Sequence, residues 1–318
     1  MKNKIIFLAL VVIIVAAIIP LVGIYLTKPT SEESTKNLVD LEDRIKKLEW
    51  EIESLNKRIS PYIYGGEAVG YVIEFENGVK FYFAGDTGLS SDLRLIGEYY
   101  KPDVAFLPIG NIYTTDPRTA AYATILIKPS TYVVPTHYGS FPELTHDPKQ
   151  FFEELKKYDL EDKYLEFKVG EEKEILGIKV EWLGHNHWLL ETPNGTRILI
   201  DPEVKYNPDF PTKYRELVQL GDIDLILVTH GHFDTMTLSD LRKWGDLFDP
   251  IFITPYELGI WLKSRLPAYK ILALGQGSRI SKIEMLELGV EEEKVKEISN
   301  IVINVVPAAH SSSITPVE

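Results

Sequence analysis

The sequence predicts an α/β fold over residues 62–318, in which helices cover a core of β-sheets. Two patterns predict it. Segments of alternating apolar and polar residues, which are typical of strands, take turns with segments of helical periodicity. The chain has 318 residues, enough to bury a sizeable core. Because a strand with one apolar face must bury it against another layer, this pattern indicates α/β layers around a sheet core.

The first half of this region begins with a predicted hairpin. Two alternating segments flank Asn77-Gly78, a pair typical of tight hairpin turns. Helical periodicity then follows three times, and a strand pattern separates each helix from the next. The hairpin strands are predicted at 68–75 and 79–83, the helices at 91–99, 118–127 and 148–157, and the separating strands at 104–107 and 132–135.

The second half is richer in strands. Asn194-Gly195 turns the chain between two of them, and helical patterns begin at Leu238 and Glu257. The strands are predicted at 178–183, 187–191, 197–200, 223–228, 251–254 and 301–306.

An uncharged run of 22 residues, 5–26, precedes the predicted domain. At about 1.5 Å per residue, a helix of this length crosses the ~30 Å of membrane hydrocarbon. A cleaved signal peptide is the alternative, but such peptides have a shorter apolar region and a small-residue cleavage site. We therefore expect an uncleaved anchor at residues 1–27, with the membrane as a partner. Lys2 and Lys4 precede the run, which favours a cytoplasmic N-terminus and a catalytic domain outside the cytoplasm.

A polar linker and a short heptad pattern occupy residues 28–61. Isoleucine at most a positions with leucine at d favours a parallel two-stranded coiled coil. We expect a homodimer through Leu38–Ile59, and the alternative is a single amphipathic helix packed on its own domain. The apolar heptad positions are Leu38, Leu41, Ile45, Leu48, Ile52, Leu55 and Ile59.

The composition excludes several classes of function. Lys and Arg number 34 against 47 Asp and Glu, so the net charge is −13, which argues against a nucleic-acid partner. The chain has no cysteine, which excludes disulfides, thiolate metal ligands and a cysteine nucleophile. A metal site built on imidazoles must use the seven histidines.

Polar side chains follow four of the predicted strands, at the point where each strand ends. Asp86 and His137 follow two strands of the first half, and His310 follows the last strand. Residues 229–234, Thr-His-Gly-His-Phe-Asp, follow the strand at 223–228 and place two histidines and a carboxylate within five residues. Imidazoles and carboxylates together suit Zn²⁺, Mn²⁺ or Fe²⁺. Four such strand ends predict one shared metal site.

These segments resemble motifs of the metallo-β-lactamase fold superfamily, and in particular of its ascorbate-6-phosphate-lactonase-like branch of metal-dependent hydrolases. The resemblance implies a four-layer αββα fold and covers nearly all of residues 66–318. The matching stretches are Trp182-Leu183-Gly184-His185, Ile198-Leu199-Ile200-Asp201-Pro202, Thr229-His230-Gly231-His232-Phe233-Asp234, Pro307-Ala308-Ala309-His310-Ser311-Ser312, Ala84-Gly85-Asp86-Thr87-Gly88, Leu107-Pro108-Ile109-Gly110 and Pro135-Thr136-His137-Tyr138-Gly139.

The order of these motifs differs from that of the family. Residues 62–173 resemble its C-terminal half and residues 174–318 its N-terminal half, so we expect a circular permutation of one domain. The permutation requires the C-terminus and residues 62–66 to lie close together, as ends often do in compact domains. The alternative is that each half completes its fold with the other half of a partner chain.

The resemblance also implies the roles of the ligands. His230, His232 and His310 would hold a first metal ion, Asp86 would bridge two ions, and Asp234 and His137 would serve the second. We expect Zn²⁺, with Mn²⁺ as the alternative, as one or two ions. Thr235 stands where the family has a histidine, and a threonine hydroxyl is a poor ligand. The second site would therefore be weak, empty or completed by another group.

The remaining motif residues have less direct roles. His185 either completes the second site or orients a neighbour, and we favour an orienting role for it, as for Asp201. Tyr138, Asn111 and Tyr113 are expected at the rim, where they would donate hydrogen bonds to substrate. We assign no role to His187, at the start of a predicted strand, or to His146 in a polar loop.

The implied activity is hydrolysis by metal-activated water of an ester, lactone, amide or phosphodiester bond in a small molecule. Asp234 acts either as a ligand or, with the second site empty, as a general base. The alternative is a catalytically impaired, membrane-displayed binding or scaffold module, for which Thr235 is the only direct support.

Overall fold

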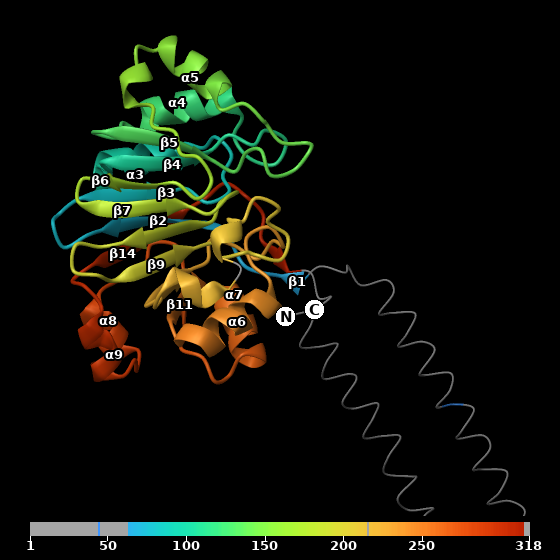
Figure 1. Ribbon diagram of the computed structural model, residues 1–318, viewed down its shortest axis with the longest axis vertical. Coiled ribbons are helices and arrows are strands. Elements are labelled where there is room, and N and C mark those ends of the chain that lie inside the picture. Colours follow the sequence, from blue (N-terminus) through green and yellow to red (C-terminus); the bar gives the residue numbers. More distant parts are fainter. Residues whose placement is uncertain (1–43, 45–62, 215, 315–318) are drawn as a thin grey trace, which may run out of the picture. The chain divides into compact units, whose positions relative to one another are not determined.

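The computed structural model describes residues 44, 63–214 and 216–314. Residues 63–214 and 216–314 form two large β-sheets packed face to face, with helices on the outer faces, and a small two-stranded sheet (Figure 1). The predicted anchor at residues 1–27 lies outside the described residues, as does the predicted coiled coil except for Arg44, which is helical.

The predicted membrane localisation, with a cytoplasmic N-terminus and an external catalytic domain, is corrected by the structure. Among residues 44, 63–214 and 216–314, no helix has both the length and the apolar character that a membrane span requires. The apolar run at 5–26 that prompted the prediction is not among the residues described.

The first sheet has six strands, in the order β13-β14-β2-β3-β4-β5. Strand β2 pairs antiparallel with both β14 and β3, whereas β3, β4 and β5 run parallel. The helices α3, α4 and α5 connect or follow the parallel strands. The bounds are β13 Arg279–Ile280, β14 Val302–Pro307, β2 Val69–Glu74, β3 Lys80–Phe83, β4 Val104–Pro108, β5 Tyr132–Thr136, α3 Asp92–Tyr100, α4 Pro117–Ile127 and α5 Lys149–Lys156.

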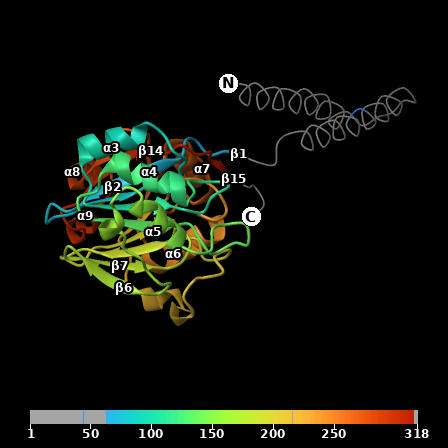
Figure 2. The same cartoon turned by 90° about the horizontal axis from the view of Figure 1, so that it is seen from above.

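The second sheet has seven strands, in the order β12-β11-β10-β9-β8-β7-β6. Its antiparallel part, β6 to β9, is a meander, and β9 to β12 are parallel. Figure 2 shows β6 and β7 on the opposite side of the domain from α3 and α8. The bounds are β6 Glu172–Ile175, β7 Ile178–Trp182, β8 Trp188–Glu191, β9 Arg197–Ile200, β10 Leu225–Leu227, β11 Ile251–Pro255, β12 Ile271–Leu274, α6 Leu238–Phe248, α7 Tyr256–Arg265, α8 Lys282–Glu287 and α9 Glu292–Glu297, with short 3₁₀ helices at Glu161–Lys163, Thr212–Tyr214 and Leu217–Leu220.

The parallel part of the second sheet is buried on both faces. Along β9, Ile198 and Ile200 belong to the apolar core between the sheets, whereas Leu199 faces the helices α6 and α7. This alternation follows from the period of two residues in a strand. Trp244 of α6 is fully buried in the outer layer, where its indole NH donates to the carbonyl of Pro202. The predicted α/β layering, with sheets in the middle and helices outside, is thus confirmed.

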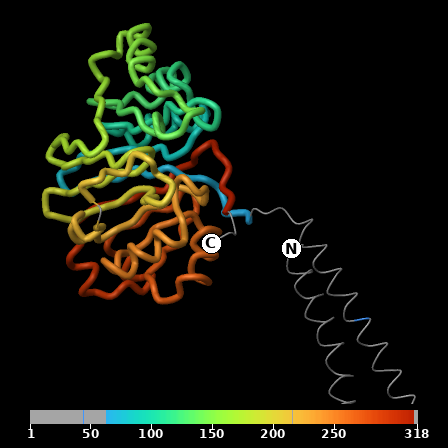
Figure 3. The backbone as a smooth tube through the Cα atoms, turned by 45° about the vertical axis from the view of Figure 1, so that its right-hand side comes forward, coloured from blue at the N-terminus to red at the C-terminus, as the bar shows by residue number. Residues whose placement is uncertain are grey.

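The two ends of the described domain lie side by side. Strand β1 (Ile63–Tyr64) pairs antiparallel with β15 (Ser313–Ile314), and the tube view shows these blue and red segments together (Figure 3). The permuted order requires this proximity. The order itself is not tested by any comparison, so it stays a prediction.

Candidate metal centre

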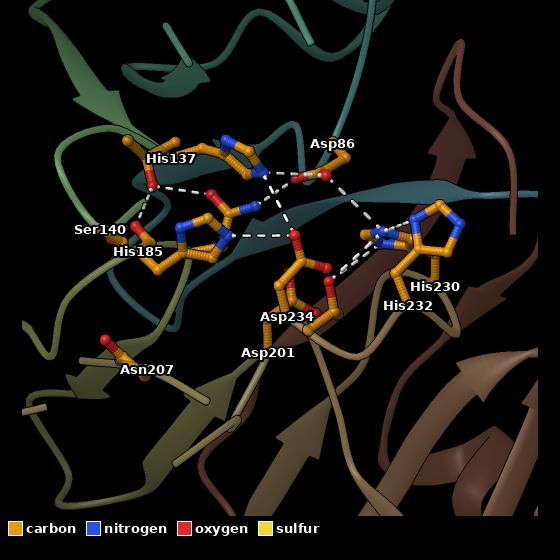
Figure 4. Close-up of polar contacts among 12 residues, drawn as sticks. Asp86, His137, Ser140, His185, Asp201, Asn207, His230, His232 and Asp234 are labelled. Carbon is orange, nitrogen blue, oxygen red and sulfur yellow. Dashed lines mark hydrogen bonds and ion pairs between the residues drawn. The ribbon is translucent and has the colours of Figure 1, made fainter. Parts of the chain in front are cut away.

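Polar loops from both sheets meet at one edge of the domain (Figure 4). Asp86 follows β3, His137 follows β5, and His310 follows β14, so these three come from the six-stranded sheet. His230, His232 and Asp234 follow β10 of the seven-stranded sheet, and the tight turn between β7 and β8 adds His185. The loops converge because the carboxyl ends of neighbouring parallel strands share one edge of a sheet, where α/β proteins place their functional groups.

The first cluster consists of three imidazoles. His230 Nε2 lies 3.1 Å from His232 Nδ1, and His310 Nε2 lies 3.2 Å from the same atom. A tetrahedral zinc ion with bonds of about 2.0–2.1 Å to nitrogen holds its ligand atoms about 3.3 Å apart. The spacing of these nitrogens therefore fits three corners of such a site.

The second cluster consists of His137, His185 and Asp234. Asp234 Oδ2 lies 3.4 Å from His185 Nε2 and 3.8 Å from His137 Nε2. The two imidazole rings are 4.1 Å apart between centroids. Both histidines are buried, and apart from the carboxylates of Asp86 and Asp234 the structure gives their ring nitrogens no hydrogen-bond partner among the described residues. Buried nitrogens without partners are costly unless another group, such as a metal ion, satisfies them.

Asp86 lies between the two clusters. Its Oδ2 is 3.1 Å from His137 Nε2, 3.7 Å from His230 Nε2 and 3.6 Å from His310 Nε2. One carboxylate oxygen is therefore within ligand spacing of nitrogens from both groups, which is the placement that a bridging ligand requires. All of these groups belong to one copy of the chain, so the described ligand set does not need a partner subunit.

Hydrogen bonds tie the ligand loops to one another. The amide of Ala309 donates to the Thr87 hydroxyl at 3.0 Å, and Gly88 donates to the Ala309 carbonyl at 3.0 Å. The amide of Gly231 donates to Ser312 Oγ at 3.1 Å. The Gly-Asp-Thr-Gly, His-x-His and Ala-His-Ser-Ser motifs thus fix the relative positions of the loops as well as supplying ligands.

A chain of hydrogen bonds orients His230. Its Nδ1 lies 3.0 Å from the Thr229 hydroxyl, which lies 2.8 Å from Asp201 Oδ2. The Thr229 amide donates to the other Asp201 oxygen at 2.7 Å. If Nδ1 carries the ring proton, it donates to Thr229 and leaves Nε2 free to bind a metal. Asp201 therefore stands where the sequence analysis places it, behind a ligand.

A second tie orients Asp86. Asn186, in the turn between β7 and β8, donates from Nδ2 to Asp86 Oδ1 at 2.5 Å. Its own Oδ1 accepts from the Thr136 hydroxyl at 2.8 Å. Asn186 thereby holds one oxygen of Asp86, so that the other oxygen points between the two clusters.

Two glycines leave space for these side chains. A Cβ on Gly110 would lie 2.5 Å from His137 Nδ1, and a Cβ on Gly85 would lie 2.8 Å from the Thr229 side chain. Gly85 also has a φ of +57°, which disfavours other residues. The glycines of the two motifs therefore allow the close approach of the ligand loops.

Burial keeps several imidazoles neutral. It lowers the pKa of His230 to about 3. It also lowers the pKa of His185, where the neighbouring His137 adds to the effect, and that of His232, where His310 does so. A neutral imidazole has the free electron pair that a metal ligand requires.

The two carboxylates stay ionised despite their burial. Burial opposes the charge of Asp86, but the attraction of His137, His230 and His310 holds its pKa well below the usual value. The pKa of Asp234 is also lowered, since the hydrogen bond and charge of His185 outweigh burial and the repulsion of Asp86. Burial opposes the charge of His137, but Asp86 raises the pKa of that ring to about 9. His137 thus holds a positive charge between two carboxylates, at a point where a metal cation would take the place of its proton.

A pocket of about 410 Å³ opens over both clusters. Apart from the ligands, most of its lining is apolar or aromatic. Phe141 and Phe233 meet edge to face with their ring centroids 6.2 Å apart. The lining side chains outside the ligand set are Tyr113, Phe141, Glu143, Leu144, Phe233, Ser311 and Ser313.

The structure brings together all six predicted ligands but only one of the three predicted substrate contacts. Tyr113 lines the pocket and is 60% exposed. The expectation for Tyr138 is corrected: it is buried in the core, with its ring 4.9 Å from that of Trp182. Asn111 is exposed but is not among the residues that line the pocket.

The two histidines without an assigned role lie apart from both clusters. His187 is buried between aromatic rings, with centroids 5.6 Å from Phe210 and 6.2 Å from Trp244. His146 is exposed in its loop, as expected.

Comparison with known proteins gives the family. Residues 179–315 match one family model described as a beta-lactamase superfamily domain, and residues 53–138 match a second model with the same description. The chain belongs to the metallo-β-lactamase superfamily. The two matches together cover both halves of the domain and include every ligand named above.

Curated relatives of this superfamily member are named UPF0173 metal-dependent hydrolases. One from Koribacter versatilis is 51% identical over 88 residues, which is 28% of this chain and 37% of the relative. One from Methanopyrus kandleri is 46% identical over 112 residues, 35% of this chain and 48% of the relative. The chain thus spans less than half the length of these relatives.

Two solved structures are also similar to parts of the chain. A novel metallo hydrolase from Ignicoccus hospitalis is 43% identical over 30% of this chain and 41% of its own, with a TM-score of 0.29. The metallo-beta-lactamase fold protein YhfI from Bacillus subtilis is 10% identical over 67% of this chain and 93% of its own, with a TM-score of 0.43.

Proposed function

We propose that this protein is a metal-dependent hydrolase that cleaves an ester, lactone, amide or phosphodiester bond of a small molecule. The observation that carries the proposal is the position of Asp86 Oδ2 between two groups of buried, neutral or ion-paired ligands. Bound Zn²⁺ or Mn²⁺ supplies a water molecule of lowered pKa and polarises the bond to be cleaved. The relatives' printed names support the same class of reaction.

The chain's own residues position the reacting groups. His230, His232 and His310 hold one ion, and Asp86 faces both positions. Asp234 uses Oδ2 toward the histidines of the second cluster, while its buried Oδ1 has no hydrogen-bond partner among the described residues. That second oxygen is free to accept a proton from water, so Asp234 is the candidate general base.

The pocket favours a substrate that is uncharged and apolar beside the bond to be cleaved. Phe141 and Phe233 form an aromatic wall, and Leu144 lies in the same lining. Outside the ligand set, the charged side chain in the pocket lining is that of Glu143. None of the residues lining this pocket is Lys or Arg. Outside the ligand set, a substrate with a terminal phosphate gains no cationic partner among the lining residues, and Glu143 repels it. Esters, lactones and amides with an apolar substituent therefore fit better than phosphate monoesters.

The scaffold alternative rests on Thr235, which weakens the second site. The experiment that separates the two is elemental analysis of the full-length protein, combined with a panel of esters, lactones, amides and phosphodiesters. We expect bound metal, turnover that a chelator abolishes, and recovery on adding Zn²⁺ or Mn²⁺. Asp86→Asn should lose turnover. Stoichiometric metal without turnover on any member of the panel would support the scaffold instead.

The proposal includes a homodimer through Leu38–Ile59. Its support is the spacing of the apolar heptad residues. Sedimentation equilibrium of the full-length protein in detergent-free buffer should give the mass of two chains. Leu41→Asp with Leu48→Asp should give one chain and leave metal binding intact. A monomeric wild-type protein would refute this part.

A further inference from the structure

The second cluster lacks a ligand at the position of Thr235. This threonine is buried, and its hydroxyl lies 3.3 Å and 3.4 Å from the two nitrogens of His230, a member of the first cluster. The hydroxyl therefore lies against a ligand ring of the other ion position. A neutral hydroxyl is also a poor ligand beside imidazoles and carboxylates.

An imidazole from another part of the chain lies in the second cluster. His185 belongs to the turn between β7 and β8, fifty positions before Thr235 in the chain. Its Nε2 is 3.4 Å from Asp234 Oδ2, and its ring centroid is 4.1 Å from that of His137, with the two rings tilted by 44°. The side chain is 3% exposed, and apart from Asp234 its ring nitrogens have no polar partner among the described residues.

From this placement we infer that His185 is a metal ligand and supplies the imidazole that Thr235 cannot. The inference rests on the proposed function, because it assigns a residue to the second ion of the same site. The second ion is then held by His185, His137, Asp234 and the bridging Asp86. An orienting role for His185 is the expectation from the sequence, but the one polar group that its ring faces is Asp234, itself a member of the cluster, and its Nδ1 has no hydrogen-bond partner among the described residues.

The backbone around His185 is built to hold its ring in place. The residue has a left-handed conformation with a φ of 53°, which is uncommon for a side chain with a Cβ. Its carbonyl oxygen accepts three hydrogen bonds, which hold the turn. The donors are Thr136 Oγ1 at 2.9 Å, Trp182 Nε1 at 2.9 Å and the amide of His137 at 3.2 Å. Strained backbone of this kind concentrates at functional sites.

The backbone also links His137 and His185, the two histidines of the second cluster. The hydrogen bond from the His137 amide to the His185 carbonyl ties the loop after β5 to the turn after β7. The same two residues present their rings to Asp234. The turn therefore carries a ligand position that does not depend on residue 235.

His187 provides a matched control. It lies two residues away, is equally buried, and has no hydrogen-bond partner for its ring nitrogens within the described part of the chain. Its ring, however, packs between Phe210 and Trp244 and does not belong to either ligand cluster. A variant at this position reports the effect of losing a buried imidazole from the same turn without losing a ligand.

The test counts ions and measures their affinities in the full-length protein. The apoprotein, prepared with a chelator, is titrated with Co²⁺ and Zn²⁺, and the metal retained after dialysis is determined by elemental analysis. We expect two ions in the wild type and in His187→Gln. In His185→Ala we expect the first ion unchanged, the second weakened by at least tenfold, and its share of the visible Co²⁺ absorption lost.

A second variant restores the ligand from the other position. Thr235→His in the His185→Ala background should regain the second ion, which a merely structural role for His185 does not predict. Two ions of unchanged affinity in His185→Ala would overturn the inference. So would an equal loss in His187→Gln, or a folded double variant that still binds one ion. A wild-type protein that binds fewer than two ions would instead refute the binuclear site of the proposed function.

Discussion

Asn186 offers the sharpest test of how the chain holds its bridging carboxylate. The substitution Asn186→Ala removes the donor to Asp86 Oδ1 and the acceptor for Thr136 Oγ1. Asp86 is then free to rotate, and its buried Oδ1 has lost the donor that satisfied it. The substitution leaves every proposed ligand in the chain.

The expected loss of metal affinity follows from the hydrogen bond that the substitution removes. A hydrogen bond to a charged group contributes about 1.5–3 kcal/mol. Partners that orient metal ligands typically contribute 10–100-fold in metal affinity, which is about 1.4–2.7 kcal/mol. The two figures agree, so we expect the affinity for the weaker ion to fall by about 10–100-fold. Competition with a chromogenic chelator measures this affinity directly.

The control is a second buried asparagine, whose side chain makes its hydrogen bond to the backbone and not to a candidate ligand. Asn304 lies in β14 and donates to the carbonyl of Val72 at 3.3 Å. Asn304→Ala should lower the free energy of unfolding without changing metal affinity. If Asn186→Ala keeps wild-type metal affinity, or if both variants lose it equally, then Asn186 does not position Asp86.

Three further predictions concern pH, specificity and packing. Burial raises the pKa of Glu203 to about 8, above its usual value near 4.5. The folded state therefore holds a proton that the unfolded state releases, so stability is full at acidic pH and is lost as pH rises toward 8. Between pH 6 and pH 8 the free energy of unfolding should fall by about 2 kcal/mol. Glu203→Gln should remove this pH dependence when unfolding is measured in urea. The same pH dependence in the variant would refute the raised pKa of Glu203. Glu143→Lys should raise kcat/KM for a substrate with a terminal anion by about two- to tenfold relative to its neutral counterpart, and the gain should be smaller at high salt. An unchanged ratio of the two kcat/KM values would show that Glu143 does not face the substrate. A Cβ on Gly97 of α3 would lie too close to the carbonyl oxygen of Ile127 in α4. Gly97→Ala should therefore lower the free energy of unfolding by about 1–3 kcal/mol. A stabilised variant would mean that α3 and α4 can move apart without a loss of stability.

The strands that the sequence predicts are those with a buried face. The patterns at 68–75, 104–107 and 197–200 correspond to β2, β4 and β9, because apolar residues recur there with the period of a strand. Strand β6 was not predicted, because two exposed glutamates interrupt the apolar pattern at this edge of the seven-stranded sheet. The short helices α8 and α9 were also missed, since six residues give too little periodicity to recognise.

The convergence of the candidate ligands could be predicted because strand ends bring them together, whereas of the residues that support them Asp201 was predicted and Asn186 was not. Asn186 and Asp86 are a hundred positions apart, and no local pattern links an amide in one turn to a carboxylate after another strand. The error for Tyr138 has a local cause. His137 adopts a left-handed conformation with a φ of 56°, and the next side chain packs on Trp182 in the core, away from the rim.

The site depends on contacts between loops more than on the order of those loops along the chain. Asp86 is tied to the turn of β7 and β8 by Asn186, and the loops after β3, β14 and β10 are tied to one another by Ala309 and Ser312. Each tie joins residues far apart in sequence. The pairing of β1 with β15 brings the two ends of the described domain to the same place, beside the loop of His310. An exchange of the two halves along the chain therefore alters the connections between strands without changing which side chains meet at the candidate metal centre.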